Sequence, residues 1–332
     1  MKKKILAMLM AGVMVLGLAA CGGGGDDSTG GETGGETASL SMATGGTSGT
    51  YYGFSGVLAQ VLNEKVEGMN ITVQSTGASS ANIDLIDTNA NQLAIVQNDV
   101  MYYAYNAKDM CEGKEPVQSY SAVMSCYPEY VQIIANKSIN SIEDLKGKKV
   151  SVGDAGSGVE FNARQILAAY GIDIESDITK NNQGFADSAD SLKNGTIDAA
   201  FVVAGYPTTA VSELASTYEF NILPVDEEHA KALMDEYGFY TYGEIPGDTY
   251  KGVSDAVPAL AVMATIIARN DVSEDVIYNM VKAIFDNQEE IATGHAKGAE
   301  LSKETAVQGI NIPFHPGAEK YFTEEGVFPA AE

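Results

Sequence analysis

The chain has 332 residues, of which 45% are hydrophobic and 20% are charged, a balance that suits a globular protein with room for two domains. Its net charge is −25, and the acidic residues are spread along the chain. Such a surface repels nucleic acid and anionic membranes, and no basic stripe reverses this, so we expect no nucleic-acid partner. Because Lys and Arg are few, an anionic ligand is expected to be held by backbone N–H groups at helix ends.

The N-terminus predicts an export signal with a lipid attachment site. Three lysines precede an apolar run over residues 5–18, which is too short to span a membrane comfortably. The run ends in Leu18-Ala19-Ala20-Cys21, which looks like a bacterial lipobox; the alternatives are a plain signal peptide or a short membrane helix. We expect residues 1–20 to be a lipoprotein signal peptide, with Cys21 lipidated and the protein anchored to the outer face of the cytoplasmic membrane.

Residues 21–38 are expected to form a flexible tether. They are almost entirely Gly, Asp, Glu, Ser and Thr, so they cannot bury a core. Two further cysteines, Cys111 and Cys126, follow in the chain. In an exported protein they form either one disulfide or two separate buried thiols, and the sequence does not decide between these.

The first folded stretch predicts a βαβαβ unit. An apolar strand at 39–44 runs into Gly45-Gly46-Thr47-Ser48-Gly49, and a helix follows with apolar residues at i, i+3, i+4, i+7 and i+8. Strand-like runs at 71–74 and 93–96 each lead into another loop and helix. This order implies a parallel sheet, whose ligands bind beyond the carboxyl ends of the strands.

A second alternating unit begins near residue 149. Two strand-like runs, 121–124 and 130–135, separate it from the first unit. It contains strands at 150–152 and 199–203, each followed by a loop and a helix. An apolar run at 259–268 and a helix that Ser273 caps then lead back toward the first unit. We therefore predict an α/β fold with two lobes joined by two hinge strands, near 130–135 and 259–268, and a ligand cleft between the lobes.

The motifs of several enzyme and cofactor classes are missing. Gly153-Asp154-Ala155-Gly156-Ser157-Gly158 lacks the third glycine and the distal acid of a dinucleotide fingerprint, and no P-loop occurs. The three histidines have no partner at metal-ligand spacing, and no nucleophile elbow is present. We expect a protein that is not an enzyme, with no cofactor and no metal. Arg164 is expected to be a solvated helical residue that can pair with Glu160, rather than a ligand contact.

Several segments, in order over residues 40–325, resemble the TAXI family of TRAP transporter solute receptors. The segments that carry the resemblance are residues 44–52, 75–77, 94–99, 153–158, 201–207, 239–241, 245–246, 250–252 and 313–319. The resemblance implies a type II periplasmic-binding-protein fold, with lobe I at 39–134 plus 259–332 and lobe II at 135–258. It also implies capture of a small solute, a glutamate-like amino acid or a dicarboxylate, which is delivered to TRAP-type membrane permease subunits.

Carried over position by position, the resemblance implies a set of ligand contacts. These are Gly46, Thr47, Tyr51, Ser75, Thr76, Ser79, Gln97, Asp99, Ser157, Gly158, Gly205 and Tyr206. Two residues depart from the family pattern: Ser48 and Ala78 stand where glycine is common, and both narrow the space near the backbone. The alternative function is a ligand-sensing lipoprotein of the same fold, which presents its state to a membrane receptor. The sequence does not identify the solute, the coupling ion or the oligomeric state.

Overall fold

A computed structural model describes residues 38–328, which contain one ten-stranded mixed sheet with helices packed against it. The order of the strands along the sheet is β2-β1-β3-β10-β4-β7-β5-β6, with β8 and β9 paired at its sides. The expected signal peptide at 1–20, Cys21 and all but the last residue of the expected tether at 21–38 lie outside the described residues.

The first βαβαβ unit is present as predicted. Its strands β1 and β3 are parallel neighbours, and β2 is parallel to β1 on the other side. The elements are β1 (Ala38–Ala43), α1 (Thr50–Lys65), β2 (Met69–Gln74), α2 (Ser79–Asp87), β3 (Leu93–Gln97) and α3 (Asn98–Asn106), followed by the short 3-10 helix η1 (Asp109–Cys111). These elements, together with the C-terminal helices, make up the first lobe.

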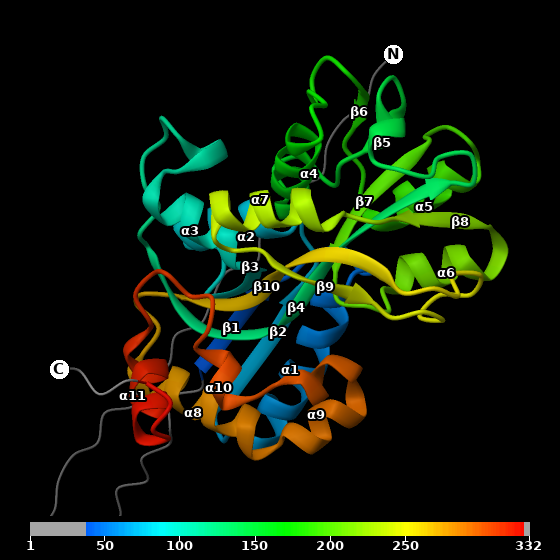
Figure 1. Cartoon of the computed structure of the whole chain (residues 1–332). Helices are drawn as coiled ribbons and strands as arrows, with labels where there is room; N and C mark the ends of the chain where they lie inside the picture. The colour runs from blue at the N-terminus through cyan, green and yellow to red at the C-terminus, as the bar shows by residue number, and fades with distance from the viewer. Residues whose placement is uncertain (1–37, 329–332) are drawn as a thin grey trace, which may run out of the picture. The chain divides into compact units, whose positions relative to one another are not determined.

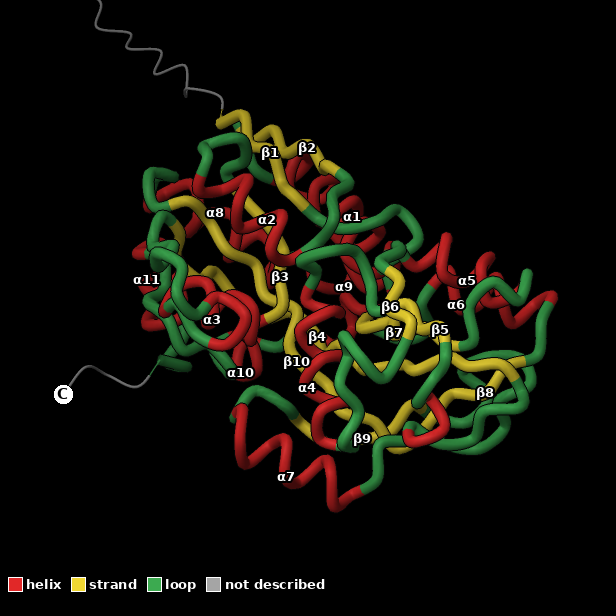
Figure 2. Tube along the Cα trace, turned by 90° about the horizontal axis from the view of Figure 1, so that it is seen from above, coloured by secondary structure: helices red, strands yellow, loops and turns green. Residues whose placement is uncertain are grey.

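Two long antiparallel strands connect the lobes. The runs at 121–124 and 130–135, predicted as separate strands, form the single strand β4 (Tyr120–Asn136), so that expectation was wrong. The Tyr127-Pro128-Glu129 sequence between the two runs continues the strand, because all three residues pair with the adjacent strand β10 (Val257–Arg269). At one end β10 pairs with β3, and at the other β4 pairs with β7. β4 and β10 are therefore the two hinge strands (Figures 1 and 2).

The second lobe repeats the alternating pattern around the parallel strands β5, β6 and β7. Three short strands in it, β6, β8 and β9, were not predicted; β6 and β9 contain mainly polar residues and glycine. The elements are the 3-10 helix η2 (Glu143–Leu145), β5 (Lys149–Ser151), α4 (Gly158–Ala169), β6 (Thr179–Asn181), α5 (Phe185–Lys193), β7 (Ala199–Ala204), α6 (Thr209–Thr217), β8 (Phe220–Leu223), α7 (Glu227–Tyr237) and β9 (Thr241–Ile245). The residue boundaries expected for the two lobes remain a prediction.

The C-terminal helices return to the first lobe. The hydroxyl of Ser273 caps the first of them by accepting a hydrogen bond from the Val276 N–H at 3.4 Å, as predicted. Figure 1 shows α8 and α9 beside α1, and Phe322 of α11 is buried in the same apolar cluster as Phe54 of α1. The elements are α8 (Glu274–Asp286), α9 (Gln288–Gly294), the 3-10 helix η3 (Ala296–Glu300), α10 (Lys303–Ala306) and α11 (Pro316–Glu324).

The two cysteines within the described residues are separate thiols. Cys111 and Cys126 are both buried and free, so the second of the two alternatives holds. Burial raises the pKa of Cys126 above its usual range, so this thiol is protonated at neutral pH. Neither side chain lines the cavity described below.

Helix α2 begins at a strained residue. Ala78, its N-cap, has φ = 70° and ψ = −147°, a conformation that glycine adopts readily and that costs other residues roughly 1–3 kcal/mol. We expect Ala78→Gly to stabilise the fold by about 1 kcal/mol after the added chain entropy of glycine is subtracted, measured by urea unfolding. The matched variant Ala81→Gly, inside the same helix, should instead destabilise by about 1 kcal/mol. A loss of stability in Ala78→Gly would show that the backbone of Ala78 is not strained.

Candidate functional site

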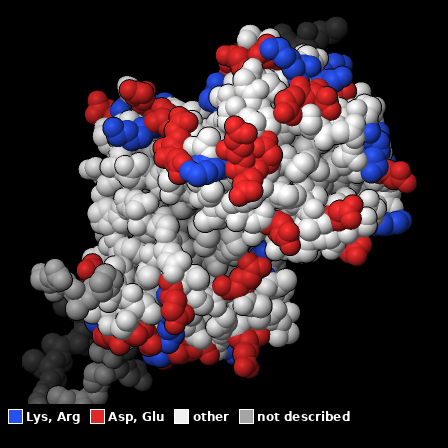
Figure 3. All heavy atoms as spheres, viewed as in Figure 1, with Lys and Arg blue, Asp and Glu red and all other residues white. Residues whose placement is uncertain are grey.

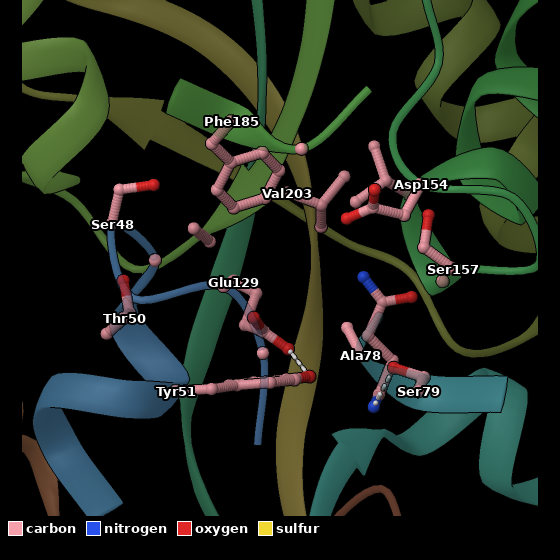
Figure 4. Close-up of a pocket in the computed structure, with 18 residues that line it drawn as sticks. Ser48, Thr50, Tyr51, Ala78, Ser79, Glu129, Asp154, Ser157, Phe185 and Val203 are labelled. Atoms are coloured by element: carbon pink, nitrogen blue, oxygen red, sulfur yellow. Dashed lines mark hydrogen bonds between the residues drawn. The ribbon is translucent and has the colours of Figure 1, made fainter. Parts of the chain in front are cut away.

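A small cavity of about 50 Å³ lies between the two lobes, at the carboxyl ends of the parallel strands (Figure 4). The segments that follow β1, β2, β5 and β6 contribute to its wall, as do the last residues of β3 and β7, and hinge strand β4 contributes one residue. The lining residues are Gly45, Gly46, Ser48, Gly49, Thr50, Tyr51, Ala78, Ser79, Gln97, Glu129, Asp154, Ser157, Gly158, Val159, Gly184, Phe185, Val203 and Ala204. This is where an open parallel α/β sheet places its ligands.

Four helices begin at the cavity. The first residues or N-caps of α1 and α2 come from the first lobe, and those of α4 and α5 from the second. The first N–H groups of a helix have no partner within the helix and lie at the positive end of its dipole. The cavity therefore presents positive potential from both lobes and suits an anionic group such as a carboxylate.

The Gln97 side chain extends from the end of β3 into this space. It is 2% exposed, and its carbonyl oxygen accepts no hydrogen bond from the described residues. The amide lies against the backbone of Gly158 at the start of α4, where a Cβ atom would come within 1.8 Å of the Gln97 Oε1 atom. The Gln97 amide is therefore a close contact between the first lobe and the start of α4 in the second.

Glu129 of strand β4 places a buried carboxyl group at the cavity. The Tyr51 hydroxyl donates a hydrogen bond of 2.6 Å to Glu129 Oε2, shown by the dashed line in Figure 4. Burial raises the pKa of Glu129 well above its usual range, and the bond from Tyr51 only partly opposes this. Sequence reasoning missed this residue, although an acid between two apolar runs was a usable signal.

A second carboxyl group comes from the other lobe. Asp154, in the loop after β5, lies beside Ser157 in Figure 4, and its side chain makes no hydrogen bond within the described part of the chain. Burial raises its pKa, and the nearby Asp187 adds to the effect. None of the described residues that line the cavity is Lys or Arg. Residues 38–328 also contain no cluster of His, Cys, Asp or Glu able to hold a metal ion.

Half of the residues expected to contact the ligand line the cavity: Gly46, Tyr51, Ser79, Gln97, Ser157 and Gly158. The other six do not. Thr47 is exposed, and the Ser75 and Thr76 hydroxyls donate to backbone carbonyls of the β1–α1 loop, each at 2.9 Å. Asp99, Gly205 and Tyr206 lie at contacts between the lobes, described below. Arg164 pairs with Glu175 at 2.7 Å, not with Glu160 as suggested.

A family model described as the NMT1-like family matches residues 42–326. The chain belongs to the NMT1-like family.

Solved structures resemble this NMT1-like protein over most of its length. The alkanesulfonate-binding protein SsuA from Xanthomonas axonopodis pv. citri matches with a TM-score of 0.50 at 16% identity, covering 87% of this chain and 84% of that one. A putative L-cystine ABC transporter protein from Listeria monocytogenes matches with a TM-score of 0.50 at 16% identity, over 80% and 99% of the two chains. A structure from Streptococcus mutans, whose description concerns glutathione import via GshT, matches with a TM-score of 0.50 at 14% identity, covering 84% of this chain and 98% of that one.

These likenesses confirm the predicted fold class. The NMT1-like protein has the mixed α/β fold of type II periplasmic binding proteins, with two lobes, two hinge strands and a cleft. The structures described as an alkanesulfonate-binding protein and as a putative L-cystine ABC transporter share this fold. No helix within residues 38–328 is long and apolar enough to cross a membrane.

One edge of the cavity in the NMT1-like protein is closed by direct contacts between the lobes. The Ala210 N–H of α6 donates to the Ser48 carbonyl at 3.2 Å, and the Thr50 hydroxyl donates to the Gly205 carbonyl at 3.0 Å. Lys297 of η3 is 3% exposed, and its ammonium group lies 4.6 Å from the centre of the Tyr206 ring. A cation held over an aromatic face away from water is attracted by roughly 2 kcal/mol.

A buried polar network closes a second contact between the lobes, between α3 and α4. The Asn162 amide donates to Asp99 Oδ2 at 2.8 Å and to the Tyr240 hydroxyl at 2.9 Å. Gln165, one turn further along α4, donates to Asp109 at 2.7 Å. Burial raises the pKa of Asp99 to about 6, although its hydrogen bonds favour the charged form. Asp99 therefore contributes to lobe closure rather than to the cavity wall.

Proposed function

We propose that this NMT1-like protein is a lipid-anchored extracytoplasmic receptor that captures a small carboxylate-bearing solute and delivers it to a TRAP-type secondary transporter. The observation that carries the solute class is the convergence of four helix N-termini, two from each lobe, on one cavity. A carboxylate there is stabilised by N–H groups of both lobes together. It therefore binds the closed arrangement more tightly than the open one.

The site also supports a cycle of opening and closing. The cavity is about 50 Å³, whereas a cavity of roughly 150 Å³ is needed to hold a benzene molecule. A solute of amino-acid size therefore has to part the lobes in order to enter and leave. The direct contacts on both sides of the cavity, at Lys297 and at Asp99, hold the closed state.

The transporter class rests on the sequence resemblance to TAXI receptors. Two of the solved structures of the same fold are described for ABC transport, and SsuA is described as binding alkanesulfonates, which are also organic anions. The lipid anchor at Cys21 rests on the lipobox pattern. The alternative, a sensor lipoprotein that signals through a membrane receptor, uses the same binding site.

Calorimetric titration tests the solute class. The full chain, purified in detergent, is titrated with acetate, L-alanine, L-glutamate and succinate, and with the corresponding primary amides as controls. We expect at least one carboxylate to bind and to raise the melting temperature, with its amide binding at least tenfold more weakly. If no carboxylate binds better than its amide, the proposed solute class is wrong.

Reconstitution tests the transporter class. The receptor is added to proteoliposomes that contain TRAP-type permease subunits, with an ion gradient and without ATP. Solute uptake that needs both the receptor and the gradient supports TRAP delivery. Uptake that needs ATP and ABC-type subunits instead would contradict it.

A further inference from the structure

We propose that the lobes close with uptake of one proton at Asp99, so that solute capture is coupled to pH through a carboxyl group outside the binding cavity. The proton comes from solvent when the lobes close and returns to solvent when they part. The proposal rests on the proposed function, because the coupling is measured as an affinity for solute. It concerns the regulation of capture and not the chemistry of the solute.

Asp99 lies where the first lobe meets the second. It is in the first turn of α3 and 1% exposed, and it does not line the cavity. Its Oδ1 atom accepts a hydrogen bond of 2.8 Å from the Val100 N–H on its own helix. Its Oδ2 atom accepts one of 2.8 Å from the Asn162 amide of α4, on the opposite lobe. Parting of the lobes therefore removes Asn162 and lets water reach the carboxyl group.

The network around Asp99 contains more hydrogen-bond acceptors than donors. The Asn162 amide donates both to Asp99 and to the Tyr240 hydroxyl, and the Tyr240 hydroxyl donates to Gln165 Oε1 at 2.5 Å. The Asn162 carbonyl oxygen belongs to a residue that is 0% exposed, and it accepts no hydrogen bond from the described residues. A proton on Asp99 adds a donor to this network, and the Asn162 carbonyl accepts it when the amide turns over.

The charged groups that face Asp99 are also acids. They are Asp109 from η1 and Glu129 from β4. The other titratable groups beside it are the hydroxyls of Tyr103 on its own helix and Tyr240 from β9, and burial raises the pKa of both, so they are neutral. Helix α4 presents uncharged amides.

No basic side chain within residues 38–328 forms an ion pair with Asp99. The N-terminus of α3 favours the charged form, but it belongs to the same lobe and acts in the open and the closed state alike. A charged Asp99 is therefore buried on closure without a cation from the opposite lobe, which is unfavourable.

The direction of the coupling follows from the two states of Asp99. Burial raises its pKa to about 6 in the closed arrangement, from the ordinary value of 3.8 that we assign to the open, solvated carboxyl group. Because the closed state binds the proton more tightly, closure becomes more favourable as the pH falls from about 6 to about 4. Above this range the lobes close only by burying a carboxylate. A fall in pH thus strengthens capture, and a rise promotes release.

The variant Asp99→Asn tests the proposal, because an uncharged amide of the same shape mimics the protonated residue at every pH. The full chain and the variant are titrated calorimetrically with acetate, L-alanine, L-glutamate and succinate at pH 5.0 and pH 7.5. For each solute that binds, we expect the variant to bind more tightly than the wild type, by about 100-fold at pH 7.5 and about 10-fold at pH 5.0. The ratio of the two proteins at one pH cancels protons bound by the solute or by Glu129.

Proton counting provides a readout that a purely structural role of Asp99 would not change. Titrations in two buffers of different ionisation enthalpy give the number of protons taken up on binding. At pH 5.0 the wild type should take up about one proton more than Asp99→Asn, whereas at pH 7.5 the two proteins should not differ. The control Asp84→Asn, which changes an exposed acid on α2, should behave as the wild type in every titration. Melting temperatures establish that both variants are folded.

The outcomes separate this inference from the proposed function. If a carboxylate binds but the ratio of affinities is the same at both pH values, with no difference in proton uptake, the coupling is overturned and the receptor stands. Weaker binding by folded Asp99→Asn at both pH values would show that closure needs the charged carboxylate, which also overturns it. If neither protein binds any of the four carboxylates, the proposed function fails, and the inference that rests on it fails too.

Discussion

Replacing Gly158 with alanine is expected to weaken solute binding by at least about 100-fold while both lobes stay folded. A Cβ atom at this position would lie 1.8 Å from Oε1 and 2.4 Å from Cδ of Gln97, on the opposite lobe. Either the Gln97 amide leaves the cavity or the lobes cannot close, and both outcomes remove contacts that only the closed state makes. Because the clash disappears when the lobes part, and alanine favours a helix, the melting temperature without ligand should not fall.

Calorimetry measures the affinity of this variant, and small-angle X-ray scattering with saturating ligand measures how far the lobes close. The matched control is Gly56→Ala in α1, where an added Cβ meets nothing within 4 Å. It should leave affinity unchanged and stabilise the helix by about 1 kcal/mol. The double variant Gln97→Ala with Gly158→Ala should close again without regaining affinity. Wild-type affinity in Gly158→Ala would show that the closed arrangement is not the binding state.

Replacing Lys297 with methionine is expected to weaken binding by about 30-fold without unfolding the protein. Methionine keeps the apolar stem but removes the cation from the face of Tyr206, a contact between lobes worth roughly 2 kcal/mol when shielded from water. Glu300, which loses its partner, is 37% exposed and is solvated at little cost. The substitution should therefore weaken the closure of the lobes around the solute, and not the stability of the fold.

Lys303 provides a closely matched control. It also pairs with an acid, Glu325, and lies 5.8 Å from the centre of a tyrosine ring, Tyr321, but all three residues belong to the first lobe. Lys303→Met should change stability slightly and affinity not at all. If Lys297→Met instead lowers the melting temperature and leaves the affinity unchanged, Lys297 serves packing within the first lobe only.

The repeating units were predictable from the sequence because strands such as β3 and β7 are apolar along most of their length and helices such as α1 carry an apolar face. Strand β3 is buried at all five positions, and Gly- or Ser-rich loops follow β1, β2 and β5. β4 was misread as two strands because Pro128 and Glu129 interrupt the apolar run. In the structure, β10 pairs with this stretch on one side, and the Tyr51 hydroxyl donates a hydrogen bond to the Glu129 carboxyl group. A buried glutamate at this position of β4 is tolerated only because of these tertiary contacts.

The position of the cavity was predictable from the sequence, but the acidic side chains that line it were not. The Gly-rich corners indicated where the cavity forms, since carboxyl ends of parallel strands share one edge of the sheet. Glu129 and Asp154 are 2 of 45 acidic residues, and only Glu129, which lies between two apolar runs, has a sequence signal that separates it from the solvated acids. Figure 3 shows acidic side chains over much of one face of the molecule. Burial, which the sequence does not give, distinguishes Glu129, and the lining of the cavity identifies Asp154.

The place of β10 in the sheet constrains the order in which the chain can fold. This strand lies between β3 and β4, although it is made more than 120 residues after β4 begins. The sheet of the first lobe therefore cannot close until residue 269 has been synthesised, whereas the parallel core of the second lobe is complete by residue 204. Contacts this distant in sequence form slowly. During that interval β3 and β4 each have an unpaired edge, which can pair with other chains until β10 is in place.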